Sequence, residues 1–78
     1  MNVPTPSVAA SVRAELRAAD LTQERIGEAL GLDQTSVSRR MKGKIPWRAD
    51  ELAQLSRVFG IPVERFYAPR PVYQAATA

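Results

Sequence analysis

The sequence contains no cysteine and no histidine among its 78 residues. Disulfide bonds are therefore excluded, and so are zinc fingers, which need thiolate and imidazole ligands. No apolar run reaches the roughly 18 residues of a membrane span, and no basic segment opens the chain as in a signal peptide. We therefore expect a cytoplasmic domain that has no membrane association, binds no metal and depends on its own apolar core.

Groups that carry catalysis are equally scarce. Serine and threonine occur without histidine or cysteine to activate them, and the sequence has no glycine-rich phosphate loop. A chain of this length has room for one compact domain with a modest core. We therefore expect no enzyme activity, no cofactor and no small-molecule substrate.

The charged residues are unevenly distributed along the chain. Eleven Lys and Arg and eight Asp and Glu give a net charge of +3. Residues 34–49 contain no acidic residue but five basic ones: Arg39, Arg40, Lys42, Lys44 and Arg48. An isolated basic run is most often a solvated face, but a concentrated positive field also suits a polyanionic partner.

Apolar residues recur at spacings of three and four, which predicts an all-α fold of five helices. The helices are expected at about residues 8–19, 23–30, 34–42, 48–59 and 63–68. Residues 1–6 contain two prolines and are expected to form a flexible arm. Residues 7–68 would then be the domain, and residues 69–78 a tail that is flexible or makes a dimer contact.

The second and third predicted helices begin with the same signal, a polar N-cap between two apolar residues that form a hydrophobic staple. The two sets are Leu21, Thr22 and Ile26, and Leu32, Asp33 and Val37. Gly31 suits the left-handed residue that ends a helix. Two short helices joined in this way predict a helix-turn-helix, whose second helix enters the DNA major groove.

The residues of this segment also follow a known pattern: Leu21-Thr22-Gln23-Glu24, Ile26, Leu30-Gly31-Leu32, Gln34-Thr35-Ser36-Val37-Ser38-Arg39, Gly43-Lys44 and Pro46. Through them the chain resembles the Cro and phage-repressor (Xre-type) family over about residues 8–68. The resemblance implies a five-helix, lambda-repressor-like domain. It also implies a Cro-like or repressor-like transcriptional regulator that binds a double-stranded DNA operator as a homodimer.

The resemblance further implies which residues touch DNA. Those expected to contact base edges are Gln34, Thr35, Ser38 and Arg39. Their chemistry agrees, because Gln pairs with adenine, Arg pairs with guanine, and a Thr methyl can touch the thymine methyl. Those expected to contact phosphates, and so to position the protein on DNA, are Gln23, Arg40, Lys42, Lys44 and Arg48.

Three positions depart from the family pattern. Gly27 stands where many relatives have alanine, at a close approach of two helices. Leu16 and Met41 stand where many relatives pair an arginine with a glutamate, and their joint change predicts an apolar contact between them. Arg48 stands where Ser or Thr commonly caps the fourth helix, which leaves the first residue of that helix open.

Several interpretations compete with these. Trp47 could stack on the DNA backbone, but a lone aromatic residue before a helix is more often part of the core, and we treat it so. Phe66, Tyr67, Val72 and Tyr73 either pack on the domain or make a dimer contact.

The polar residues Gln34, Thr35 and Ser36 could also serve only in local hydrogen bonds at a helix start. Two other functions stay open for the whole chain. It could be the antitoxin-type DNA-binding partner of a toxin, or a basic helical adaptor that binds an acidic protein.

Overall fold

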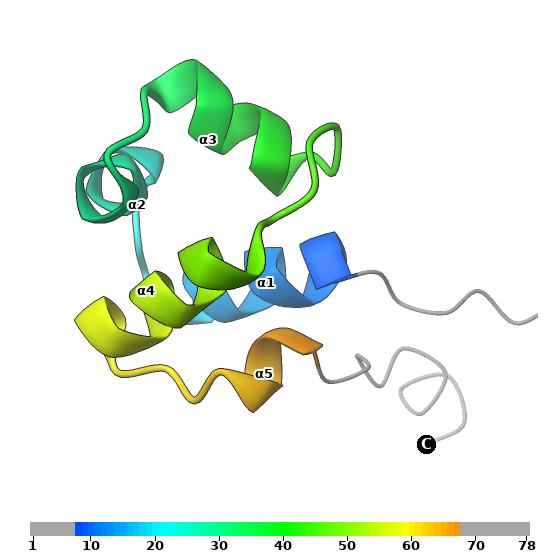
Figure 1. The fold of residues 1–78 in the computed structure, drawn as a ribbon, viewed down its shortest axis with the longest axis vertical. Coiled ribbons are helices and arrows are strands. Elements are labelled where there is room, and N and C mark those ends of the chain that lie inside the picture. The colour runs from blue at the N-terminus through cyan, green and yellow to red at the C-terminus, as the bar shows by residue number, and fades with distance from the viewer. Residues whose placement is uncertain (1–7, 68–78) are drawn as a thin grey trace, which may run out of the picture.

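The computed structural model describes residues 8–67, and within that range the chain forms helices and no strand (Figure 1). The helices are α1 (Val8–Ala18), α2 (Gln23–Leu30), α3 (Gln34–Met41), α4 (Ala49–Phe59) and α5 (Glu64–Tyr67). The predicted all-α, five-helix fold is confirmed. The arm predicted at residues 1–6 and the tail predicted at 69–78 lie outside the described residues.

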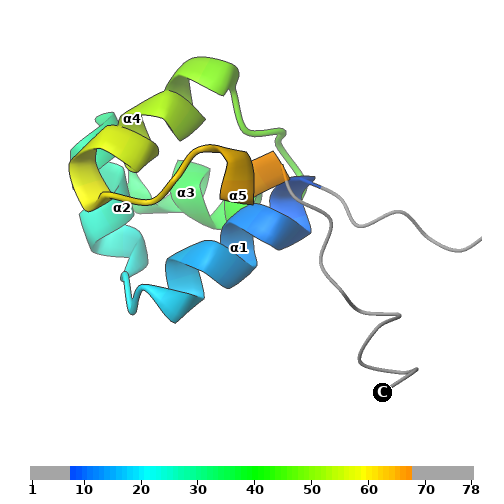
Figure 2. The ribbon, with the colours of Figure 1, turned by 90° about the horizontal axis from the view of Figure 1, so that it is seen from below.

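The helices pack in neighbouring pairs. Helix α1 packs against α5 and α3, and α2 packs against α3 and α4. Figures 1 and 2 show α3 and α5 on opposite sides of the molecule, with α1 and α4 between them. The face of α3 that points away from α1 is therefore left open.

All five helices and the loops after α3 and α4 contribute to a single core. Trp47 is only 9% exposed, so its interpretation as a core residue is confirmed, whereas Val58, on α4, is 49% exposed. The buried apolar residues are Val12, Leu16, Ile26, Val37, Met41, Trp47, Leu52, Leu55, Ile61 and Phe66.

The apolar side of α1 is buried at its centre and exposed at its ends. Val12 and Leu16 are fully buried, but Val8 is 37% exposed and Ala19 is also exposed. Val8 is the first residue of α1 and Ala19 follows its last residue, so both lie at the edge of the core. The inward face also includes Ser11, which is 2% exposed.

Helix α1 ends in a Schellman motif that turns the chain toward α2. The N–H of Leu21 donates to the carbonyl oxygen of Leu16 (3.1 Å), and that of Asp20 donates to Arg17 (2.9 Å). Asp20 has a φ of 60°, in the left-handed region that favours glycine. Leu16 and Leu21 both pack in the core, which fixes this turn and hence the entry into α2.

The first residue of α4, left open by the sequence, is Ala49, with Arg48 at the N-cap position. Arginine has no acceptor atom and cannot bond the free amides of the first turn. Instead, Glu51 Oε1 accepts the N–H of Arg48 (2.9 Å), and Asp50 Oδ1 accepts the N–H of Glu51 (3.1 Å). Two acidic residues in the first turn thus replace the usual Ser or Thr cap.

Candidate nucleic-acid interface

The turn between α2 and α3 is built by caps at both helix starts. Thr22 Oγ1 accepts the N–H of Arg25 (3.1 Å), and Asp33 Oδ1 accepts the N–H of Ser36 (2.7 Å). Gly31 ends α2 with a φ of 69°. The caps and the stop predicted from the sequence are therefore confirmed, and they set the direction in which α3 leaves α2.

At Gly27, helix α2 lies close to the turn that follows it and to α3, whose Val37 Cγ2 would be 3.5 Å from an added Cβ. A Cβ built on this residue would lie 2.6 Å from the carbonyl oxygen of Leu32, which is a backbone atom that cannot turn aside. The N–H of Leu32 also donates to the Gly27 carbonyl (3.0 Å). The close approach expected at this position is confirmed, and here it leaves room only for glycine.

Helix α3 is amphipathic, because its apolar residues recur at a spacing of four. Val37 and Met41 face the core and are buried. Gln34, Thr35 and Arg39 are exposed on the other face. The helix therefore offers a polar and basic surface to a partner while its apolar side holds it on the domain.

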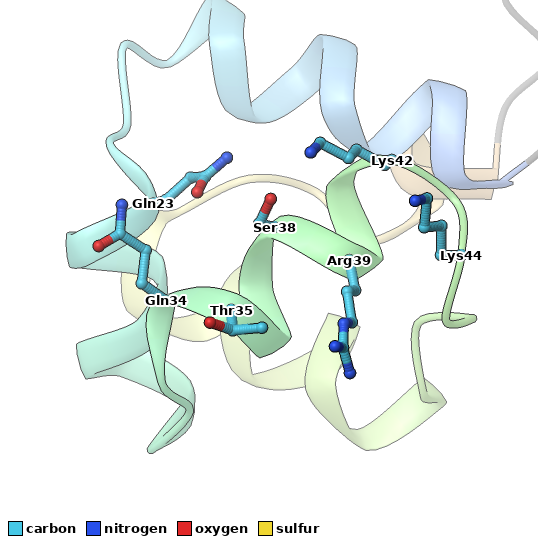
Figure 3. Close-up of a pocket in the computed structure, with 7 residues that line it drawn as sticks. All are labelled: Gln23, Gln34, Thr35, Ser38, Arg39, Lys42 and Lys44. Atoms are coloured by element: carbon cyan, nitrogen blue, oxygen red, sulfur yellow. The ribbon is translucent and has the colours of Figure 1, made fainter.

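This surface forms an open pocket of about 400 Å³, which we call the basic pocket (Figure 3). Three basic residues and no acidic residue line it. Four of its residues come from α3, one from the start of α2 and two from the segment after α3. The lining residues are Gln23, Gln34, Thr35, Ser38, Arg39, Lys42 and Lys44.

The basic pocket thus brings together all four predicted base-contacting residues and three of the five predicted phosphate-contacting ones. Hydrogen-bonding amides, hydroxyls and cations on one open surface can contact both the base edges and the phosphates of a nucleic acid.

The pocket does not include Arg40. The side chain of Arg40 is 12% exposed, and its Nε donates to Glu51 Oε1 (3.0 Å). Its Nη1 donates to the carbonyl oxygen of Ser36 (3.1 Å). The sequence carried a signal for this position, because Arg40 follows Val37 by three residues and so shares the inner side of the helix.

Arg48 also lies outside the pocket lining, but it is exposed. Its side chain is 72% exposed, and its Nε donates to Asp50 Oδ1 (3.1 Å). This hydrogen bond is the main cause that holds the pKa of Asp50 below its usual value. Because an ion pair between exposed groups is weak, this contact holds the Arg48 guanidinium only loosely.

Arg13, on α1, holds the end of α3 and was not singled out from the sequence. Its Nη1 donates to the carbonyl oxygen of Met41 at 3.0 Å. A cation near the C-terminus of a helix is favourable for the helix dipole. The contact joins residues 28 positions apart, so no local pattern could have indicated it.

The segment after α3 is tied to the helix by its backbone. The N–H of Gly43 donates to Arg40 (3.1 Å), and the N–H of Lys44 donates to Arg39 (2.9 Å). Gly43 has a φ of 79°, in the left-handed region that favours glycine, and the chain turns there. These bonds hold Lys42 and Lys44 at the edge of the basic pocket.

Among the residues from 8 to 67, no helix has the length and apolar character required to cross a membrane. Nor does this part of the chain gather three or more acidic, histidine or cysteine side chains that could hold a metal ion.

Comparison with known proteins gives one match. A family model described as helix-turn-helix matches residues 12–66, which run from α1 to α5. No curated protein and no solved structure matches the chain significantly.

Proposed function

The chain belongs to the Cro/C1-type helix-turn-helix family of DNA-binding regulators, and we propose that it is a sequence-specific, repressor-like or Cro-like transcriptional regulator. Helix α3 enters the major groove of double-stranded DNA. The observation that carries the proposal is the basic pocket, which combines base-pairing side chains with cations on the open face of α3.

Four residues of the basic pocket contact base edges in this proposal. Gln34 and Thr35 are in the first turn of α3, and Ser38 and Arg39 follow one turn later on the same face. Gln34 pairs with adenine and Arg39 with the O6 and N7 atoms of guanine, while Thr35 offers its methyl group to thymine. Specificity then depends on a few side chains of one helix.

The phosphate contacts come from residues around α3. Gln23 is the first residue of α2, where the helix amides favour an anion. Lys42 and Lys44 follow α3, and Arg48 precedes α4. We leave Arg40 out of this group, because its guanidinium is bonded to Glu51 and Ser36.

We further propose that two copies bind a near-palindromic operator with two-fold symmetry. Their α3 helices would then lie about 34 Å apart, the distance between successive major grooves on one side of DNA. Footprinting and the stoichiometry of the complex test this arrangement. Protection of a single half-site by one chain would contradict it.

The main experiment is selection of bound sequences from a random duplex pool, followed by titration of the selected operator and of a random duplex at several salt concentrations. We expect one enriched sequence, tighter binding of it than of random duplex, and an affinity that falls steeply with salt. Weak duplex binding without salt dependence would contradict the proposal and favour a protein-binding adaptor.

A further inference from the structure

We propose that Arg40 is a positioning residue for DNA recognition, which holds α3 in a fixed relation to the start of α4 without contacting DNA itself. The inference rests on the proposed function, since it concerns how the same surface is kept in shape. Its evidence is independent of the basic pocket, because Arg40 does not line it.

The first observation is that Arg40 and Glu51 form a partly buried ion pair. The Nε–Oε1 distance is 3.0 Å, and the two side chains are 12% and 11% exposed. Desolvation offsets much of the attraction in such a pair, so its net contribution to stability is small. Its geometry is nevertheless well defined, because Arg40 Nη1 also donates to the Ser36 carbonyl in the same helix (3.1 Å).

The second observation is that one carboxylate oxygen has two donors from different elements. Glu51 Oε1 accepts both the Arg40 guanidinium and the backbone N–H of Arg48 (2.9 Å). That N–H belongs to the N-cap residue of α4. Any displacement of the Arg40 side chain is therefore transmitted to the backbone that carries Arg48.

The third observation is that the ion pair joins two helices whose main packing partners are other helices. Helix α3 packs closely against α1 and α2, and α4 packs against α2. The Arg40–Glu51 pair spans α3 and α4 directly. It fixes the spacing between Arg39, a proposed guanine contact next to Arg40, and Arg48, a proposed phosphate contact.

The test compares Arg40→Met with Arg39→Met on the selected operator and on random duplex. Methionine keeps a flexible apolar chain and removes the guanidinium in both variants. For Arg40→Met we expect about a tenfold loss of operator affinity, with random-duplex affinity and the slope of log K against log salt unchanged. Arg39→Met is the matched control at an exposed position, and it should also lose preference at one base pair.

Two other outcomes would overturn the proposal. If Arg40 binds a phosphate, Arg40→Met loses affinity on both duplexes and the salt slope falls by about one unit. If Arg40 only stabilises the fold, the folded variant binds both duplexes as the unmodified protein does. Affinities are therefore compared per folded molecule, with the folded fraction measured by circular dichroism.

A second variant makes the test independent of how well Arg40→Met folds. Glu51→Gln keeps an oxygen that accepts the Arg48 N–H but removes the charge that pairs with Arg40. We expect it to lose operator affinity by a smaller factor, because its amide oxygen can still accept a weaker bond from Arg40, and again without a change in salt slope. In the double variant Arg40→Met with Glu51→Gln the losses should not add, because both substitutions act on the same interaction. Additive losses would contradict the mechanism.

The two proposals fail in different ways. If the unmodified protein shows no salt-dependent duplex binding, the proposed function is wrong and the role of Arg40 falls with it. If the unmodified protein binds its operator and both variants bind equally well, only the positioning role is wrong.

Discussion

Arg39 and Arg40 are adjacent in the sequence and identical in chemistry, but they belong to two different regions of the molecule. Arg39 lines the basic pocket on the open face of α3, whereas Arg40 pairs with Glu51 on the side of α3 that meets α4. Successive residues of an α-helix are rotated by about 100° around its axis. This rotation is enough to place Arg39 on the surface that a partner can contact and Arg40 in a contact between two helices. The position of a basic residue on the helix therefore decides its role, and the charge run alone does not.

The same division holds for the whole of α3. Its outer face carries the polar and basic side chains of the basic pocket. Its inner face carries Val37 and Met41, which attach the helix to the core. We expect changes at the core residues of the inner face, Val37 and Met41, to lower stability and to leave base preference intact. Changes on the outer face should alter base preference and leave stability nearly unchanged.

The largest effect is expected on the inner side, at the unusual apolar pair Leu16 and Met41. Both are buried in one core cluster and α1 packs against α3, while direct contact between their side chains stays a prediction. Leu16→Ala should lower the free energy of unfolding by about 2–5 kcal/mol, because it leaves a cavity. Urea unfolding measures the loss.

The contact itself is tested by a double-mutant cycle of Leu16→Ala and Met41→Ala. Residues in contact show a coupling of about 0.5–3 kcal/mol. Additive losses would mean that the two side chains do not touch. The same variants, when folded, should keep the operator preference of the unmodified protein, and a changed preference would break the separation of the two faces.

The second largest loss of stability is expected from a substitution at Gly27. Alanine favours a helix over glycine by about 1 kcal/mol, but its Cβ would lie 2.6 Å from the Leu32 carbonyl oxygen. Because the turn must shift to accept it, we expect Gly27→Ala to destabilise the protein by about 1–3 kcal/mol. A gain in thermal stability would show that the turn between α2 and α3 adapts easily.

The outer face is tested by comparing Arg39 with Lys44, two cations of the same pocket. Arg39→Ala should cost about 1–3 kcal/mol on the operator, relax preference at one base pair and affect random duplex less. Lys44→Ala should weaken both duplexes alike and lower the salt slope by about one unit. Equal losses with unchanged preference in both variants would mean that Arg39 does not contact a base.

Local signals predicted most of this fold. The caps at Thr22 and Asp33 and the stop at Gly31 are short-range patterns, and the structure has all three as expected. The burial of Trp47 followed from its position before a helix, and it too is confirmed. These features depend on residues a few positions apart, which is why one sequence suffices to find them.

Contacts between distant residues were not predicted. The sequence grouped Arg40 with exposed cations, since nothing local indicates that Glu51, in the next helix, lies within 3.0 Å of it. The bond from Arg13 to the Met41 carbonyl was missed for the same reason. The composition of the basic pocket is visible in the sequence, and so is the spacing of Arg40 from Val37, but the pairing of Arg40 with Glu51 requires the fold.

The smallest effect is expected at Asp33, the N-cap residue of α3, which belongs to neither face of the helix. The backbone N–H of Ser36 is the main cause that holds the pKa of Asp33 below its usual 3.8, and Arg39 and Arg40 act in the same direction. An acid with a lowered pKa stabilises the folded state above its ordinary pKa, and this contribution is lost as the pH falls through the lowered value.

Asn at this position still accepts the Ser36 N–H but does not titrate. Asp33→Asn should therefore be less stable than the unmodified protein at pH 7, and the difference should shrink once the pH falls below about 4. Asp50 titrates in both proteins, so it cancels in the comparison. Thermal unfolding at a series of pH values measures the difference, and a gap that stays constant down to low pH would show that the Asp33 carboxylate gives the start of α3 no more than an uncharged cap does.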